Sequence, residues 1–208
     1  MAPYELLQQG GVVMWPLLAC SILVLTVILE RSLFWLAIRQ RRDRQLVDEI
    51  LRMAEEGQWD RIRAISRGSR DHVVRVLIVG ILHRHYDMTR AMEAEARQQL
   101  RRMERFMILL DTMITVAPLL GILGTVLGII SSFQMLGTGG VTDPKLVTGG
   151  IAQALLTTAA GLTISIVTVF PYNFFRSRID HAAHVMEKYA TGLEVVWNKT
   201  SHEIMMLP

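Results

Sequence analysis

The sequence predicts an all-α integral membrane protein with three transmembrane helices and long cytoplasmic helical extensions. Hydrophobic residues make up 51% of the chain, and its charges are gathered into blocks. Residues 30–105 hold 17 arginines, no lysine and 12 acidic residues, whereas three long segments elsewhere hold no charge at all. Because about 20 apolar residues span a bilayer as a helix, this segregation predicts membrane spans that flank a polar domain.

The first apolar segment covers residues 12–29 and is followed directly by Glu30 and Arg31. Trp15 before it and Phe34 and Trp35 after it are suited to the two membrane interfaces. A cleaved signal peptide is the alternative. No basic residue precedes the segment and no small-residue cleavage site follows it, which favours a retained span. We expect Glu30 to be an interfacial charge near Arg31.

The second and third spans are expected at residues 113–136 and 146–175, both free of charge. The third is longer than a bilayer requires, so it is expected to tilt or to extend beyond the hydrocarbon. The turn-rich connector 137–145 between them is too short to be a domain.

Arginines predict the orientation, because basic residues concentrate in cytoplasmic segments. The opposite side carries only Glu5, Asp143 and Lys145. We therefore expect a short periplasmic N-terminus (1–11), a cytoplasmic helical domain (30–112), a periplasmic loop (137–145) and a cytoplasmic C-terminal helix (176–208). The arginines that flank the spans are Arg31, Arg39, Arg41, Arg42, Arg44, Arg97, Arg101, Arg102, Arg105, Arg176 and Arg178.

Helical periodicity continues through the polar domain. Apolar residues between Leu46 and Ala54 recur at helical spacing, and Gly57 is suited to end that helix. Thr89 is a plausible N-cap for a helix that meets no breaker before Pro118 and therefore is expected to run to residue 135. The third span is likewise expected to continue into the C-terminal tail as one helix.

Small and polar residues follow one face of each of the last two spans. In the second span they are Pro118, Gly121, Thr125, Gly128 and Ser132, and in the third they are Gln153, Thr157, Gly161, Ser165 and Thr168; Thr158 lies on a slightly rotated face. Small residues let membrane helices approach closely, so packing alone is one explanation. We assign Pro118, Gly121, Gly124, Gly128 and Gly161 to helix packing. Gln153 is less easily explained by packing, because its amide needs hydrogen-bond partners and should face protein or water.

The stretches "APLLGILGTVLGIISSF" (117–133) and "GGIAQALLTTAAGLTISIVTVFPYNFF" (149–175) strongly resemble the MotA/TolQ/ExbB proton-channel family. The three-span layout and the helical inside domain are similar to ExbB and TolQ over nearly the full length, whereas MotA has four spans. The resemblance implies a homo-pentamer in the bacterial inner membrane. It also implies a pore that encloses helices of an ExbD- or TolR-like partner, with work delivered through a TonB- or TolA-like protein.

The same resemblance implies that Thr125 and Thr158 face the pore. Well-known members carry a glutamate where this chain has Gln153, and glutamine cannot release a proton. We place Thr157, Ser132 and Ser165 in the same hydroxyl-lined pathway.

No span contains Asp, Glu, His, Lys or Arg in its core, so if protons cross here, the titratable acid must come from another chain. The resemblance supplies a candidate, the membrane aspartate of the single-span ExbD/TolR-like partner. The resulting hypothesis is a non-enzymatic subunit of a motor driven by the proton-motive force. The alternative is a non-conducting scaffold that anchors a cytoplasmic domain or a partner protein. No catalytic constellation, cofactor motif, metal-ligand cluster or nucleic-acid-binding stripe is visible, and membrane lipid is expected around the spans.

Overall fold

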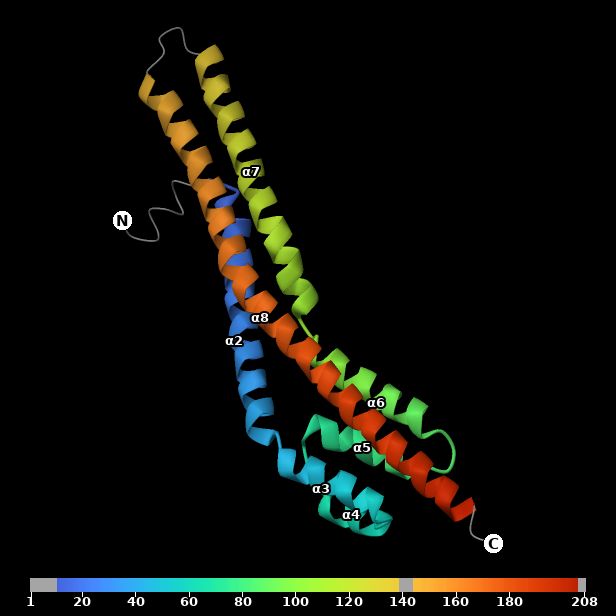
Figure 1. Cartoon of the computed structure of the whole chain (residues 1–208). Coiled ribbons are helices and arrows are strands. Elements are labelled where there is room, and N and C mark those ends of the chain that lie inside the picture. Colours follow the sequence, from blue (N-terminus) through green and yellow to red (C-terminus); the bar gives the residue numbers. More distant parts are fainter. Residues whose placement is uncertain (1–10, 139–143, 206–208) are drawn as a thin grey trace. The chain divides into compact units, whose positions relative to one another are not determined.

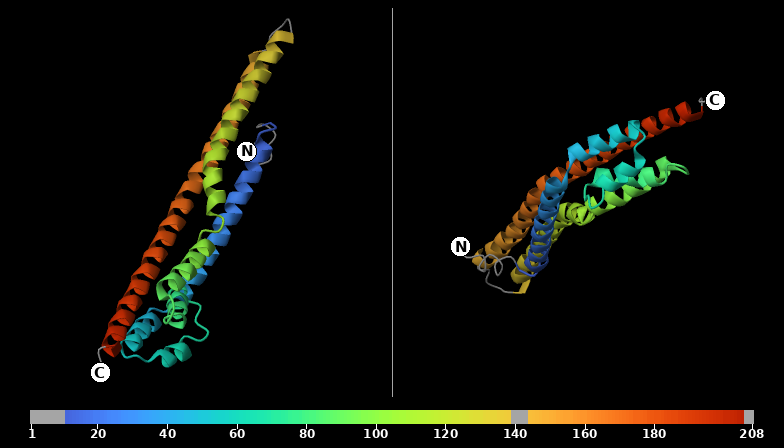
Figure 2. Two further views of the ribbon diagram at one scale, coloured as in Figure 1. Left: turned by 90° about the vertical axis from the view of Figure 1, so that its right-hand side faces the viewer. Right: turned by 90° about the horizontal axis from the view of Figure 1, so that it is seen from below.

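The computed structural model describes residues 11–138 and 144–205, and these form helices joined by short connections, with no strand among them (Figures 1 and 2). The predicted all-α class is confirmed. The predicted segments 1–11 and 137–145 lie for the most part outside the described residues. The helices are α2 (Met14–Arg41), α3 (Arg44–Glu55), α4 (Trp59–Ile65), α5 (His72–Leu82), α6 (Met88–Met103), α7 (Met107–Thr138) and α8 (Pro144–Met205).

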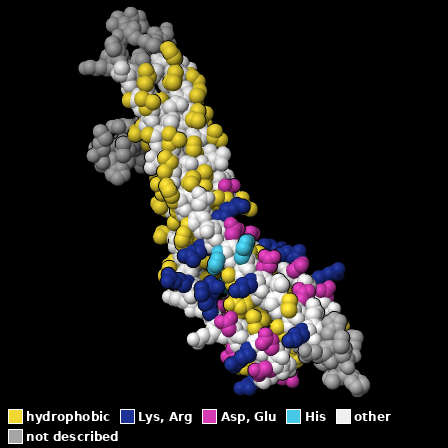
Figure 3. Space-filling model, viewed as in Figure 1, with side chains coloured by type: hydrophobic (Ala, Val, Ile, Leu, Met, Phe, Trp, Pro, Cys, Tyr) yellow, Lys and Arg dark blue, Asp and Glu magenta, His cyan; other side chains and the backbone are white. Residues whose placement is uncertain are grey.

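Three of these helices are long and apolar enough to cross a membrane. The candidate spans lie within Met14–Arg41, Met107–Gln134 and Thr148–Lys199, so the prediction of a multi-pass membrane protein with three spans is confirmed. Large apolar side chains remain exposed along them, among them Leu25, Ile122 and Leu155. Figure 3 shows such side chains over the spans, with the charges gathered over the remaining helices.

The chain divides into two compact units, which are described separately. Unit 1 contains residues 1–31 and 106–175, that is, most of α2, all of α7 and the first half of α8. Unit 2 contains residues 32–105 and 176–208, that is, the end of α2, helices α3 to α6 and the rest of α8.

Helix α2 continues beyond the apolar segment expected at residues 12–29. Its Glu30 and Arg31 form an ion pair, as expected for these neighbours, and the Arg31 side chain is buried. After this pair the helix is apolar again, and Leu33 and Leu36 expose 69% and 60% of their surfaces. The lipid-compatible surface of α2 therefore extends past its first two charges.

The expected unbroken helix from Thr89 to residue 135 is wrong. Helix α6 ends at Met103, and α7 begins at Met107 after Phe106, which has a positive φ of 66°. No glycine or proline announces this break. The centre of the Phe106 ring lies 5.6 Å from the Arg31 guanidinium carbon, which is a cation–π contact. Helix propensity is a local property and takes no account of such a contact between residues far apart in the sequence.

Thr89 is not the N-cap of α6. Helix α6 begins at Met88, so Asp87 occupies the cap position, and its carboxylate accepts a hydrogen bond from the Arg90 N–H at 2.9 Å. The Thr89 hydroxyl donates to Glu194 Oε1 on α8 at 2.8 Å instead. Asp87 and Thr89 are both residue types that cap helices well, and because the helix begins at Met88, Asp87 is the cap.

Two other helical predictions are confirmed. Helix α3 ends at Glu55 and is followed by Gly57 at a φ of +70°, the left-handed conformation that glycine adopts without strain. Helix α8 runs from Pro144 to Met205 as one helix, with Pro171 inside it. The third span therefore continues into the C-terminal tail.

Unit 2 has a hydrophobic core to which α3, α4, α5, α6 and α8 all contribute. Ile50, Ile62, Leu77 and Leu193 have no exposed surface, and Met92 on α6 is 2% exposed. The regular apolar spacing in this domain and the methionines of α6 therefore reflect helix packing.

Shortening Leu77 to alanine should destabilise this core, because deleting a buried leucine side chain leaves a cavity that costs about 2–5 kcal/mol. The measurement is thermal unfolding of the purified protein in detergent, followed by circular dichroism. Leu82→Ala is the matched control, since Leu82 ends the same helix but is 42% exposed. Equal melting temperatures for the two variants would contradict this core assignment.

Candidate functional site: the α7–α8 helix pair

Glycines bring the backbones of α7 and α8 together within unit 1. A Cβ atom on Gly121 would lie 2.9 Å from the Cα of Thr158, and one on Gly128 would lie 2.8 Å from the Cβ of Ala154. A Cβ on Gly161 would collide with the carbonyl oxygen of Ala117 and lie 3.2 Å from the Cα of Gly121. Real Cβ atoms do not approach backbone this closely, so these positions require glycine at the observed helix separation.

Three hydroxyl groups of α8 cross to carbonyl oxygens of α7. The Thr158 hydroxyl donates to Gly121 O at 2.9 Å, and the Ser165 hydroxyl donates to Ile114 O at 2.7 Å. The Thr157 hydroxyl lies 3.4 Å from Gly121 O and 2.7 Å from Ala154 O on its own helix. In apolar surroundings each bond satisfies a donor whose isolation would cost about 1–3 kcal/mol.

Other hydroxyls are retained by their own helix. Thr125 donates to Ile122 O at 2.6 Å, and Ser132 donates to Gly128 O at 2.9 Å. Ser132 is nevertheless at the helix contact, because it is 3% exposed and its oxygen lies where a Cβ on Gly150 would be. Thr125 is half-buried, so part of its side chain remains accessible.

Gln153 is half-exposed on α8 and lies beside the start of α2. Its Nε2 occupies the space that a Cβ on Gly11 would need, and Gly11 has a φ of +68°. The structure therefore gives this amide a neighbour within the same chain. It brings Thr157 and Thr158 to one acceptor, Gly121 O, and it places Gln153 against Gly11, three residues before α2.

Neither α7 after Asp111 nor α8 between Lys145 and Arg176 contains a charged residue or a histidine. The polar groups at the helix contact are therefore hydroxyls and backbone carbonyls, which orient hydrogen bonds but do not exchange protons at neutral pH. Such a surface can guide water or hold a carboxyl group supplied by another chain.

Residues 69–188 match the model of the MotA/TolQ/ExbB proton channel family. The chain belongs to this family. Along 92% of its length it is 32% identical to a putative biopolymer transport protein, ExbB-like 3, of Synechocystis, across 93% of that protein. It is 37% identical to ExbB-like 1 of the same organism, across 94% of this chain and 79% of that protein.

The biopolymer transport protein exbB1 of Vibrio cholerae is 28% identical across 79% of this chain and 75% of its own length. The two Synechocystis proteins match more than nine-tenths of this chain, so the similarity is not limited to the two glycine-rich spans. Members of the ExbB branch are non-enzymatic components of transport channels. This chain is accordingly an ExbB-like biopolymer transport protein.

Two small residues at the α7–α8 contact did not stand out in the sequence, namely Gly150 and Ala117. Gly150 meets Ser132, and Ala117 meets Gly161. Gly150 lies four residues before Ala154, on the same helix face as Thr157 and Gly161. The spacing of three and four residues could therefore have predicted that Gly150 belongs to the contact. Pro118, which the sequence groups with the packing residues, is half-buried within α7.

Replacing Gly161 by alanine should push α7 and α8 apart, because its methyl group would meet the backbone of Ala117. Overpacking of this kind costs about 1–3 kcal/mol. Gly149→Ala on the same helix is the control, since nothing lies within 4 Å of its added Cβ. The control should be neutral or stabilising by up to about 1 kcal/mol, as alanine favours helix. Melting temperatures in detergent measure both, and a Gly161 variant as stable as the control would refute the close contact.

Proposed function

We propose that this ExbB-like chain is a subunit of an inner-membrane motor driven by the proton-motive force. Five copies would form a pore, lined by α7 and α8, around the helices of an ExbD- or TolR-like partner. The motion would energise work at the cell envelope or transport at the outer membrane, through a TonB- or TolA-like protein. Family membership and the paired, charge-free helices support this function.

The proposed topology places the N-terminus in the periplasm. It makes residues 30–112 and 176–208 cytoplasmic and residues 137–145 periplasmic. The arginines that flank the apolar segments on one side support it. Helix α2 continues past residue 29, and its exposed Leu33 and Leu36 would lie at the cytoplasmic interface of the membrane.

The absence of a charged side chain from the spans is the observation that carries the proposed mechanism. A proton path needs a group that exchanges protons or a continuous file of water. The spans of this chain offer Thr125, Thr158 and Gln153, with Thr157, Ser132 and Ser165 beside them, and none of these titrates near neutral pH. The acid would therefore be the membrane aspartate of the single-span partner.

The two pore threonines are suited to recognise the protonation state of that aspartate. Each hydroxyl donates to a backbone carbonyl, Thr125 to Ile122 and Thr158 to Gly121, and keeps oxygen lone pairs that accept. A neutral carboxylic acid can donate to these oxygens without disturbing them. A carboxylate can only accept hydrogen bonds. To donate to it, the threonine hydroxyls would have to rotate and give up their hydrogen bonds to the backbone carbonyls. The hydroxyl groups would thus accept a hydrogen bond from the neutral acid and donate one to the carboxylate.

The alternative is a passive scaffold that anchors a partner or the polar domain and conducts nothing. The same lack of a membrane acid favours this alternative, as does the use of Thr157 and Ser165 as bridges between α7 and α8. Activity that depends on the proton-motive force distinguishes the two functions, because a scaffold needs the helix contact but not a pore-facing hydroxyl.

Exchanging Thr125 and Thr158 for valine should abolish function that depends on the proton-motive force, while assembly with the partner persists. Valine keeps the shape of threonine but removes the hydroxyl. Thr163→Val is the control, since Thr163 is exposed on α8 and donates only to Ala159 O of its own helix. Growth that requires energised uptake reports function, and native mass spectrometry of the co-expressed partners reports assembly. Normal growth of the Thr125→Val, Thr158→Val strain would exclude the proposed role of these hydroxyls.

Liposomes that contain this chain alone should show almost no proton flux under an imposed potential, whereas co-reconstitution with the single-span partner should raise it. A partner whose membrane aspartate is replaced by asparagine should return the flux to the level of this chain alone. A pH-sensitive dye inside the liposomes measures the flux. Rapid flux without any partner would show that the acid is not supplied in trans, and no flux with the partner would favour the scaffold.

A further inference from the structure

A cavity of about 270 Å³ in unit 2 is lined by four arginines. Arg41 is the last residue of α2, Arg70 precedes α5, Arg75 lies on α5 and Arg102 lies on α6. The buried side chains of His72 and Gln99 also line the cavity, and none of the described residues that line it is acidic. Four guanidinium groups from three helices and a loop line one small cavity, and although Arg75 is paired with Glu95, such a concentration of positive charge attracts an anion.

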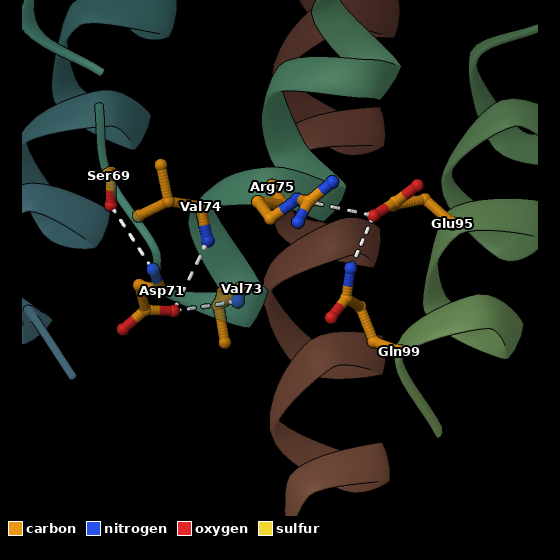
Figure 4. Close-up of polar contacts among 7 residues, drawn as sticks. All are labelled: Ser69, Asp71, Val73, Val74, Arg75, Glu95 and Gln99. Carbon is orange, nitrogen blue, oxygen red and sulfur yellow. Dashed lines mark hydrogen bonds and ion pairs between the residues drawn. The ribbon is translucent and has the colours of Figure 1, made fainter. Parts of the chain in front are cut away.

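Glu95 and Asp71 are acidic residues that contact or adjoin residues lining the cavity. Glu95 Oε1 lies 3.5 Å from Arg75 Nε and accepts a hydrogen bond from the buried Gln99 amide. Asp71 accepts from the N–H groups of Val73 at 2.7 Å and of Asp43 at 2.9 Å, and so caps α5 and holds the start of α3. Figure 4 shows that Glu95 anchors Arg75, while the Asp71 carboxylate is directed at the first turn of α5.

The His72 side chain adds a neutral hydrogen-bonding group to the cavity. Burial lowers the pKa of the His72 imidazole, and this outweighs the opposite effect of Asp71; Arg42 lowers the pKa further. Lowering keeps the imidazole neutral at physiological pH, where one ring nitrogen can donate and the other can accept. The positive charge of the cavity therefore comes from its guanidinium groups.

The remaining wall is apolar, with Phe34 and Ile38 of α2 and Met103 of α6. On α2, Phe34, Ile38 and Arg41 follow one another at spacings of four and three residues, so they share one face of the helix. An apolar surface that leads directly to arginines matches a molecule with a hydrocarbon end and an anionic end. Basic pockets beside transmembrane helices on the cytoplasmic side bind phospholipid headgroups in this way.

We propose that this cavity binds a phosphate group, through Arg41, Arg70, Arg75 and Arg102, and that the phosphate belongs to an anionic phospholipid of the adjacent leaflet. Guanidinium groups form paired hydrogen bonds with phosphate oxygens. At about 270 Å³ the cavity is slightly smaller than typical ligand pockets, which suits a headgroup. A soluble phosphate ion has the same anionic chemistry but would not use the apolar wall.

The test uses the full-length protein purified in detergent and native mass spectrometry, with added dioleoyl phosphatidylglycerol or dioleoyl phosphatidylcholine. The Arg41→Gln, Arg70→Gln variant removes two cavity charges and leaves the Arg75–Glu95 pair in place. The control is Arg63→Gln, Arg67→Gln, which removes two exposed arginines that do not line the cavity. Circular dichroism confirms that the variants fold, and Arg70→Gln alone replaces the double variant if it does not.

Phosphatidylglycerol should bind the wild type and the control in preference to phosphatidylcholine, and the cavity variant should lose at least about tenfold in affinity, as expected for charge-assisted hydrogen bonds. A second measurement is the melting temperature with added inorganic phosphate. A phosphate-dependent rise that the cavity variant lacks, without any lipid preference, would support the phosphate site and assign it to a soluble ligand. Equal behaviour of the cavity variant and the control with both probes would overturn the proposal.

Discussion

The close approach of the α7 and α8 backbones is the constraint on which unit 1 depends. Gly161 stands against the Ala117 carbonyl and Gly121 against the Cα of Thr158, so no side chain separates the helices there. This closeness brings Gly121 O within hydrogen-bond distance of the Thr158 hydroxyl. Glycine and threonine therefore act together, because the glycines bring the backbone carbonyls close and the hydroxyls then bind them. Bulky apolar side chains can cover the outside of the pair and face lipid or another subunit.

The spans and most helices of unit 2 were predictable because their signals are local. A charge-free run long enough for a bilayer, an apolar spacing of three and four residues, and Gly57 after α3 can all be read without knowing what each helix contacts. The break at Phe106 could not be predicted in this way. The ring of Phe106 contacts Arg31, which is far away in the sequence, whereas local propensity alone favours a continuous helix.

The polar groups of the helix pair show the same limit. Spacing indicates that Gly121, Gly128 and Gly161 share a contact face, but it does not indicate the partner of a threonine. Thr125 donates to its own helix and Thr158 to the neighbouring one, a difference set by the local distance between backbones. The position of Gln153 beside Gly11 depends on a glycine outside any helix, with a positive φ. The pairing of residues across helices is thus a property of the assembled fold.

Helices α7 and α8 differ in how each is connected to the polar helices that adjoin it along the chain. Helix α8 is continuous from unit 1 into unit 2, so a twist of its membrane segment about the helix axis would be transmitted along one helix, in which Pro171 lacks the N–H of a single backbone hydrogen bond. Between α6 and α7 lie residues 104–106, which are not helical, so α7 is not joined to α6 by a continuous ladder of backbone hydrogen bonds. In the proposed motor, a twist of the membrane segments would reach unit 2 along the continuous helices α2 and α8.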